Sequence, residues 1–338
     1  MSIPNIAVIG TGYIGNEHIK AIAANARAQL HTLCTTPRSQ TIAQELMATY
    51  GAQQITTDYN AVISNDNIDI VYLCTPNSQH VDQAITALQA GKHTFVEKPL
   101  AVTVADCHKI VEAAKRSGKK VMVGHGARFS RLFETIHHLV HTDTLGDACF
   151  VEGDYIHDLK PFLPYPGHDW WMDTEKEGQL PIIGGACHPL DLMRWIAGEI
   201  VEVSAYGVNK NMPQAPWYDT VITNLKFKSG AVGKCLVSCG AEIPYNLNFS
   251  YHGTKGSVVK NKLFIGGIPH VEDFSELPIK IRAEDHTCPQ ILDHFLTCIE
   301  KDQTPLIDAA DGARSVAVCC AIIESIETGQ PARVFLDF

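Results

Sequence analysis

Apolar, strand-like runs alternate with helix-like stretches over about the first 125 residues, and this alternation constrains the fold more than any other feature. Strands are expected at residues 6–9, 29–34, 68–74, 93–96 and 121–124, and helices at 14–25, 39–50, 78–90 and 104–117. Gly51 and Gly91 follow two of these helices, where glycine is a common stop. Regular strand–helix alternation is typical of a parallel sheet. The sequence therefore predicts an N-terminal Rossmann domain, a doubly wound α/β fold, over residues 1–124.

The pattern changes after Gly124. Strand-like alternation recurs with few helices between, at residues 148–157, 201–209, 220–228, 231–241, 245–252 and 256–265, and helices are expected at 188–196, 286–301 and 309–328. Closely spaced strands favour hairpins in an antiparallel sheet. We therefore expect a second, α+β domain over residues 125–338, with a large, mostly antiparallel open sheet. Residues 158–180, rich in Pro, Gly, Trp and charged residues, are expected to form a long loop of the kind that carries function.

Composition excludes several classes of protein. The net charge of −10 gives no general attraction to nucleic acid or to anionic lipid. No stretch of about 18 uncharged apolar residues is present to span a membrane, and the first residues do not resemble a signal peptide. We therefore expect a cytoplasmic protein. The 11 cysteines form no C-x-x-C pair and lie mostly in apolar runs, so reduced, buried thiols are expected rather than a metal site.

Residues 10–15 have the pattern G-x-G-x-x-G, and they lie between an apolar strand and a helix. In a dinucleotide-binding loop Gly10 would allow the tight turn, Gly12 the approach of a pyrophosphate to the backbone, and Gly15 close helix–strand packing. Tyr13 and Ile14 would begin the helix, whose free N–H groups and positive dipole end attract phosphate. This context favours a dinucleotide site over a simple glycine-rich turn.

An acidic residue about 20 positions beyond such a loop usually binds the adenosine ribose. Here Thr35 and Thr36 occupy that place, Arg38 lies just beyond, and no Asp or Glu occurs between Glu17 and Glu45. A carboxylate would repel a 2′-phosphate, whereas Thr and Arg side chains can bind and neutralise it. The sequence therefore favours NADP over NAD, and Arg38 as an ordinary solvated charge is the alternative.

Lys98 follows an apolar strand, in the segment Glu97-Lys98-Pro99. Strand ends in such a sheet face the crevice in which ligand binds. Partial burial and a neighbouring cationic nicotinamide would disfavour the protonated amine, leaving a proton acceptor near neutral pH. The position therefore indicates an acid–base residue rather than a surface charge.

His188 is expected to stand at the start of a helix entered through Gly184-Gly185. Asp191, about one turn later, either orients this histidine or favours the positive end of the helix. His188 is accordingly a second catalytic candidate, with a structural histidine as the alternative.

These motifs, together with Thr75-Pro76-Asn77 and His80, resemble the glucose–fructose oxidoreductase / inositol dehydrogenase (Gfo/Idh/MocA) family over nearly the whole chain. The resemblance implies a Rossmann domain and a C-terminal domain whose open sheet forms a homodimer or homotetramer. It implies Lys98 and His188 as catalytic residues. The cofactor-binding residues that it implies beyond the glycine loop are Thr75, Pro76, Asn77, His80, Glu97, Lys98 and Arg128.

One position departs from the family pattern. Many members carry an Asp four residues before the histidine, where this chain has Gly184. The residues that could replace it, or otherwise contact substrate with Lys98 and His188, lie in or beside the long loop: His157, Tyr165, His168, Asp169, Trp170 and Trp171. Aromatic rings stack on sugar faces, and Asp accepts hydrogen bonds from hydroxyls; packing anchors for the loop are the alternative for the two tryptophans.

The resemblance implies an NAD(P)-dependent dehydrogenase or reductase, an oxidoreductase acting on a hydroxyl or carbonyl carbon of a sugar, cyclitol or related polyol. Two alternatives remain open. One is a redox-neutral glycosidase in which NAD is recycled within each turnover. The other is a cofactor-binding sensor without chemistry, which the missing Asp makes conceivable.

Overall fold

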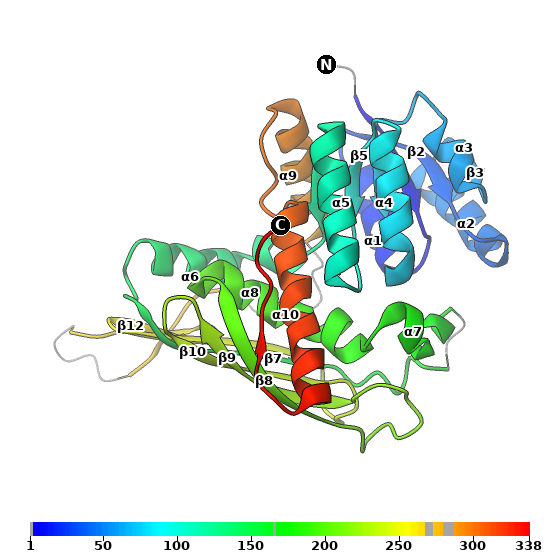
Figure 1. Ribbon diagram of the computed structural model, residues 1–338. Coiled ribbons are helices and arrows are strands. Elements are labelled where there is room, and N and C mark those ends of the chain that lie inside the picture. The colour runs from blue at the N-terminus through cyan, green and yellow to red at the C-terminus, as the bar shows by residue number, and fades with distance from the viewer. Residues whose placement is uncertain (1–2, 165–166, 268–272, 280–286) are drawn as a thin grey trace. The chain divides into compact units, whose positions relative to one another are not determined.

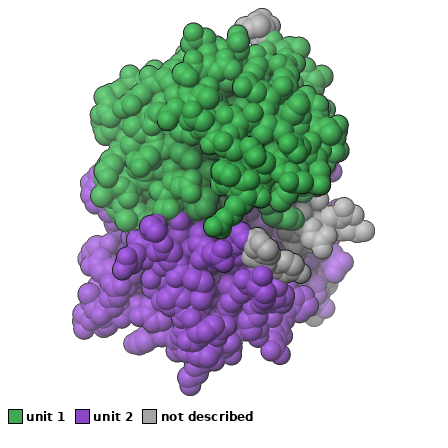
Figure 2. Space-filling model, turned by 90° about the vertical axis from the view of Figure 1, so that its right-hand side faces the viewer, with its two compact units in different colours: residues 1–126, 286–313, 338 green, residues 127–285, 314–337 purple. Residues whose placement is uncertain are grey.

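The computed structural model describes residues 3–164, 167–267, 273–279 and 287–338. The chain divides into two compact units (Figures 1 and 2). Unit 1 comprises residues 1–126, 286–313 and 338, and unit 2 comprises residues 127–285 and 314–337. Each unit is described by itself.

Unit 1 contains a six-stranded sheet in which every pair of neighbouring strands is parallel. Its strands are β1 (Asn5–Ile9), β2 (Gln29–Cys34), β3 (Gln54–Thr56), β4 (Ile70–Leu73), β5 (His93–Val96) and β6 (Val121–Val123), in the order β3-β2-β1-β4-β5-β6. This order is that of a doubly wound dinucleotide-binding fold, which places a ligand at the carboxyl ends of the strands where the order reverses, between β1 and β4.

Helices cover the sheet of unit 1 (Figure 1). They are α1 (Tyr13–Ala23), α2 (Gln40–Tyr50), α3 (Tyr59–Ile63), α4 (His80–Gln89), α5 (Val104–Ser117) and α9 (Cys288–Glu300), with short 3₁₀ turns η1 (Pro37–Ser39) and η2 (Asn77–Gln79). Their ends follow from local chemistry. The Thr103 hydroxyl accepts the Asp106 N–H at the start of α5, and Gly118 ends that helix with φ of 64°.

Helix α9 belongs to unit 1, although it was expected in a second domain over residues 125–338. Polar contacts tie it to the end of α1: Asn25 donates to Asp293 at 2.9 Å, and Arg27 donates to Thr297 at 3.0 Å and to Glu300 at 2.8 Å. These partners lie about 270 residues apart in the sequence, so local patterning does not reveal which sheet α9 covers.

Unit 2 contains a nine-stranded mixed sheet, mostly antiparallel as expected, with a parallel pair β7–β10. Its order is β14-β13-β12-β11-β7-β10-β9-β8-β15. The strands are β7 (Ala148–Ile156), β8 (Ile200–Val208), β9 (Thr220–Phe227), β10 (Val232–Ser238), β11 (Asn246–Gly253), β12 (Gly256–Val259), β13 (Lys262–Ile265), β14 (Ser275–Glu276) and β15 (Ala332–Arg333). Residues 256–265, expected as one strand, form the hairpin β12–β13, which turns at Lys260 with φ of 57°.

The helices of unit 2 are α6 (Arg131–His141), α7 (Thr174–Glu177), α8 (Cys187–Ala197) and α10 (Ala309–Thr328), of which residues 309–313 belong to unit 1. A π-helical turn, η5 (Pro181–Ala186), leads into α8. The 3₁₀ turn η3 (Gly126–Phe129) comes before α6, and the 3₁₀ turn η4 (Asp169–Met172) comes before α7. Helix α8 packs on β7 and β11. No helix among the described residues is long and apolar enough to cross a membrane.

Candidate active site

The glycine loop follows β1 and opens α1, as its pattern predicts. Gly10 has φ of 97°, and a Cβ there would lie 2.3 Å from the Cys74 carbonyl oxygen. A Cβ on Gly15 would lie 2.1 Å from the Gly10 carbonyl oxygen. Gly12, in contrast, has no neighbour within 4 Å of such a Cβ, and it caps α1 without a side-chain hydrogen bond. Two glycines are therefore required by packing, whereas Gly12 leaves open space beside the first turn of the helix, as the expected approach of a pyrophosphate requires.

The segment predicted to meet the adenosine ribose lies at the carboxyl end of β2. Thr35 is buried, and its hydroxyl is 2.8 Å from that of Thr11 in the glycine loop. Thr36 and Arg38 are exposed, and Arg38 lies in the 3₁₀ turn η1. Thr35 therefore fixes the glycine loop to β2, while Thr36 and Arg38 are accessible to a ligand.

Residues 75–77 form the carboxyl end of β4, beside β1. The Thr75 hydroxyl donates to the Gln83 side chain at 2.7 Å, which anchors this turn on α4. Asn77 is buried, and no hydrogen-bond partner is found among the described residues for its Nδ2 amide group. An unsatisfied buried amide is costly, and a bound ligand beside it would remove the cost.

Glu97 and Lys98 stand at the carboxyl end of β5, the strand next to β4. Glu97 is buried, and Lys98 is partly exposed. The Glu97 carboxylate accepts a hydrogen bond from His18 Nε2 at 2.7 Å and one from the Lys98 backbone N–H at 3.1 Å. His80 is also buried; its ring nitrogens lie 2.8 Å from the Pro99 carbonyl oxygen and 3.0 Å from that of Thr75.

In unit 2, His188 lies in the first turn of α8, and its ring stacks on Tyr155 of β7 at a centroid distance of 5.4 Å and an angle of 10°. The Tyr155 hydroxyl is 3.1 Å from Nδ1 of His157. Burial raises the pKa of Tyr155 well above its usual value, so its hydroxyl stays protonated at neutral pH and can donate to Nδ1 of His157 when that nitrogen carries no proton. Two predicted residues, His157 and His188, thus meet through a tyrosine that the sequence analysis did not select.

The glycines before His188 have different roles. A Cβ on Gly185 would lie 3.1 Å from the Tyr155 ring and 3.2 Å from Val237, so a side chain there would press on the ring that supports His188. A Cβ on Gly184 would meet Leu180 at 3.3 Å, with no other contact under 3.4 Å. The surroundings therefore do not exclude a side chain at Gly184, the position at which the resemblance led us to expect Asp.

Arg128 is almost completely buried in unit 2. Its guanidinium group binds both carboxylate oxygens of Asp191, at 2.6 and 2.8 Å, and lies 5.6 Å from the ring centre of Trp195. Asp191 also accepts from the Ser315 hydroxyl at 2.9 Å, and Arg194 donates to that hydroxyl at 2.7 Å. Both residues named from the sequence, Arg128 and Asp191, thus belong to one buried ionic network.

The remaining predicted residues belong to the loop 158–180. One of them, Tyr165, is outside the described residues. His168 stacks on Trp171 at 4.2 Å, and Trp170 meets Trp171 edge-on at 6.0 Å. The buried Trp217 donates its indole N–H to the Trp171 carbonyl oxygen. Asp169 is exposed in η4. The loop is therefore anchored through Trp171, while Asp169 remains accessible.

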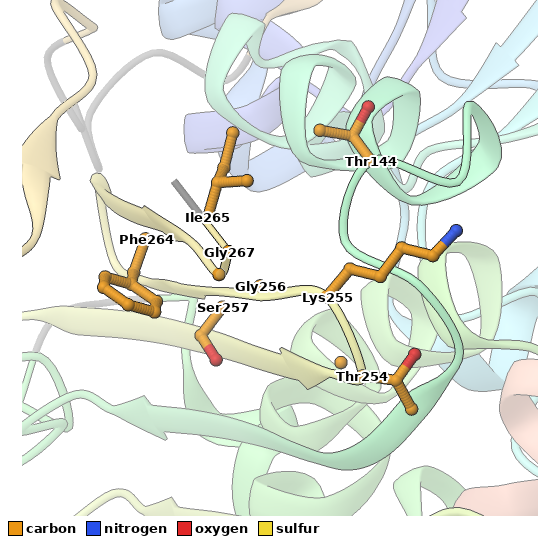
Figure 3. Close-up of a pocket in the computed structure, with 10 residues that line it drawn as sticks. Thr144, Thr254, Lys255, Gly256, Ser257, Phe264, Ile265 and Gly267 are labelled. Carbon is orange, nitrogen blue, oxygen red and sulfur yellow. The ribbon is translucent and has the colours of Figure 1, made fainter. Parts of the chain in front are cut away.

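Two further features of the described residues concern possible sites: metal ligands and a pocket. In the part of the chain that the structure describes, no three His, Cys, Asp or Glu residues are grouped to hold a metal ion. A pocket of about 550 Å³ lies around the turn between β11 and β12 of unit 2 and is lined by Thr144, Lys255 and the β13 residues Phe264 and Ile265 (Figure 3). It contains none of the predicted site residues, so we do not place the active site there.

Two family models match the chain. Residues 4–125 match a model described as an oxidoreductase family with an NAD-binding Rossmann fold. Residues 133–259 match the C-terminal domain of GFO/IDH/MocA proteins. The chain belongs to the Gfo/Idh/MocA oxidoreductase family. Its N-terminal Rossmann domain is therefore an NAD-binding domain, in agreement with the space at Gly12 and the unsatisfied amide of Asn77.

Relatives of established activity match over nearly their full length. The scyllo-inositol 2-dehydrogenase (NAD⁺) of Bacillus subtilis is 26% identical, over 97% of this chain and 95% of its own. The myo-inositol 2-dehydrogenase of Thermotoga maritima is 28% identical, over 95% of this chain and 96% of its own. A levoglucosan dehydrogenase solved with NADH has the same fold, with a TM-score of 0.89 at 24% identity, over 99% of this chain and 100% of that one.

Proposed function

We propose that this member of the family is a dehydrogenase or reductase that transfers hydride between a nicotinamide cofactor and a hydroxyl or carbonyl carbon of a sugar, cyclitol or related polyol. The observation that carries the proposal is the position of Lys98. It follows β5, and β5, β4 and β1 are neighbouring parallel strands whose carboxyl ends carry Lys98, residues 75–77 and the glycine loop. A ligand at the point where the strand order reverses reaches all three.

The bound nicotinamide would supply a hydride acceptor or donor. In the oxidative direction the Lys98 amine would take the proton of the substrate hydroxyl and become an ammonium group, while the carbon becomes a carbonyl by losing the hydride that the cofactor accepts. In the reductive direction the ammonium group returns that proton to the developing alkoxide. His188, in the first turn of α8, is proposed as the second catalytic residue.

His157 is proposed as the polar substrate contact that compensates for Gly184. When the Tyr155 hydroxyl donates to Nδ1 of His157, the ring proton lies on Nε2, which makes Nε2 a donor for a hydroxyl oxygen. Tyr155 also stacks on His188. The same phenol ring and hydroxyl therefore fix the orientation of two histidines. Asp169 and Trp170 are proposed as further contacts from the loop.

The proposal is tested by the absorbance at 340 nm of the protein with a panel of inositols, anhydrosugars, sugars and polyols, each with NAD⁺ and with NADP⁺. Turnover on one class establishes the dehydrogenase and its substrate class. Cofactor binding without turnover in either direction contradicts the proposal and favours a sensor. Cleavage of nitrophenyl glycosides without net reduction of the cofactor favours the glycosidase.

We further propose that NADP is preferred to NAD. Replacing Arg38 with Ala is then expected to raise the KM for NADP⁺ about 10-fold or more, because a charged hydrogen bond to the 2′-phosphate is lost, and to leave the KM for NAD⁺ unchanged. Arg116→Ala, which removes an exposed arginine from the end of α5, is the matched control and should change neither value. No effect on either cofactor would mean that Arg38 is a solvated loop charge, and equal effects on both would mean that it does not recognise the 2′-phosphate.

The outer face of the sheet in unit 2 is proposed to form a homodimer or homotetramer. Tyr206 and Ile222 face each other across β8 and β9 and are 77% and 50% exposed, and Val232 faces Phe150 across β10 and β7 with 56% and 38% exposed. Exposed apolar pairs at two places on one sheet face favour an association surface.

Replacing Ile222 with Lys is expected to weaken this association about 100-fold or more, because symmetry brings two new charges into one interface. Sedimentation velocity over a range of concentrations measures the effect. Ile42→Lys, at a 49% exposed position on α2 of unit 1, is the control and should leave the mass unchanged. A wild-type chain that stays monomeric would contradict the proposal.

A further inference from the structure

Buried histidines contact the segment Glu97–Pro99 on both sides of Lys98. On one side, His18 donates to the Glu97 carboxylate at 2.7 Å. On the other, the His80 ring lies 2.8 Å from the Pro99 carbonyl oxygen. The two histidine side chains are 1% and 0% exposed. All these residues belong to unit 1, and the proposed chemistry gives His18 no role.

The contact with His18 ties the Lys98 backbone to α1. A carboxylate that is 6% exposed is stable only when it is paired and hydrogen-bonded. Burial opposes ionisation of Glu97, yet the hydrogen bond from His18 and the charges of His18 and Lys98 outweigh it and lower its pKa. One carboxylate oxygen accepts from His18 and the other from the N–H of Lys98. Glu97 is thus an ionised link between α1 and the peptide group of Lys98.

The surroundings leave this link little freedom. A Cβ on Gly124 would lie 2.9 Å from the Glu97 carboxylate, so the group fills the space above that glycine. The His18 ring packs against Phe95 at a centroid distance of 4.8 Å and against Tyr72 at 5.3 Å. Close packing restricts rotamers. The positions of the imidazole and the carboxylate are therefore determined by the core beneath them.

His80 forms the second link, between the ends of two strands. Its Nε2 lies 3.0 Å from the Thr75 carbonyl oxygen after β4, and its Nδ1 faces the Pro99 carbonyl oxygen after β5. Burial lowers the pKa of His80, and the two carbonyl contacts oppose that shift. The neutral ring donates to one of these two carbonyls and contacts the other, whereas only the imidazolium donates to both. His80 therefore sets the spacing between residues 75–77 and the residues that follow Lys98.

We propose that His18 and His80 are positioning residues for Lys98. They hold residues 97–99 from both sides and so fix the amine relative to the glycine loop, which opens the helix of His18, and to residues 75–77, which lead into the helix of His80. This proposal rests on the proposed function, in which Lys98 is the acid–base group. It adds that contacts through the two histidines link the glycine loop, residues 75–77 and Lys98 to one another.

The first test replaces His18 with Leu and with Gln. Leu removes the donor to Glu97, whereas the Gln amide can still donate. Turnover is measured with a substrate identified in the panel assay. The reactivity of Lys98 is measured without substrate, as its rate of trace acetylation by acetic anhydride. Mass spectrometry follows the acetylation, and the exposed Lys115 serves as the reference. We expect His18→Leu to lower kcat by as much as about 100-fold and to change the Lys98 labelling rate and its pH midpoint. His18→Gln should restore both.

His93→Leu is the matched control, since His93 is a partly buried histidine at the opposite end of β5 that accepts the Lys120 N–H. It should lower the melting temperature without changing Lys98 labelling. Should His18→Leu not fold, His80→Gln tests the other link with the same readouts, and it should alter Lys98 labelling.

Folded variants at both histidines with wild-type labelling and kcat overturn the proposal. A wild-type protein that turns over no substrate, but whose Lys98 labelling responds to His18→Leu, contradicts the proposed function and leaves the positioning role standing.

Discussion

Replacement of Lys98 by Met is expected to lower kcat by about 10²- to 10⁴-fold, the range in which a positioned general acid–base group contributes. Met keeps the length and much of the volume of the side chain and removes the amine. The loss should therefore appear in both oxidative and reductive directions, because the same group takes the proton from the hydroxyl and returns it to the alkoxide.

Cofactor binding should survive this change. The proposed pyrophosphate site lies at Gly12 and the start of α1, and the buried Asn77 amide follows β4. The proposal therefore does not need the Lys98 amine to hold either part of the cofactor. Titration of protein fluorescence with NADH should give a dissociation constant within a factor of about three of wild type, since exposed or partly exposed single contacts contribute little. Loss of NADH binding would instead make Lys98 a cofactor contact.

Lys92 provides the matched control. It stands just before the same strand, is 6% exposed, and donates to the Asn65 carbonyl oxygen at 2.8 Å. Lys92→Met removes a buried hydrogen bond far along β5 from the site, so it should lower stability and leave kcat unchanged. Near-normal turnover in Lys98→Met, or an equal loss in Lys92→Met, would contradict the acid–base role.

Much of unit 1 could be predicted because buried parallel strands are short, apolar and bounded by glycine. The expected strand 29–34 and the expected helix 104–117 coincide with β2 and α5, whose ends carry a polar cap and Gly118. The three-residue strand β3 was not predicted, because Gln54–Thr56 has too few residues to form an apolar run. It is a strand because its backbone pairs with β2.

Contacts between distant parts of the chain could not be predicted from local pattern. The hydrogen bond between His18 and Glu97 spans 79 residues, and nothing in either motif identifies its partner. Tyr155 was missed for another reason. It and His157 are two residues apart around the end of β7 and so share a face, but only the stacking of α8 on that strand brings His188 to the tyrosine. Strand periodicity could have suggested Tyr155 once His157 was considered.

For Arg128, the sequence identified a residue of interest but did not reveal its contacts. The resemblance to the family implies a position near the nicotinamide, whereas the structure places the guanidinium group, 2% exposed, against Asp191. The two interpretations differ in what removal of the side chain would do. A cofactor contact would affect binding, and a buried ion pair would affect the stability of unit 2.

Replacement of Arg128 by Met is expected to lower the free energy of unfolding by about 3–5 kcal/mol, because it leaves the Asp191 carboxylate buried without its two-point partner. All four tryptophans lie in unit 2, at positions 170, 171, 195 and 217. Tryptophan fluorescence during urea unfolding therefore reports this unit. The exposed pair of Arg333 with Glu202 is the control, and Arg333→Met should cost about 1 kcal/mol or less.

A double-mutant cycle separates the ion pair from its surroundings. If Arg128 and Asp191 stabilise the fold through each other, Arg128→Met combined with Asp191→Leu should cost less than the sum of the single changes, since the second change removes the uncompensated charge that the first one leaves. The loss of unfolding free energy that remains in the double variant then includes the contacts of Ser315 and Arg194 with Asp191. Additive costs would mean that each side chain acts separately. A stable Arg128→Met protein that no longer binds NADH would instead assign the guanidinium group to the cofactor.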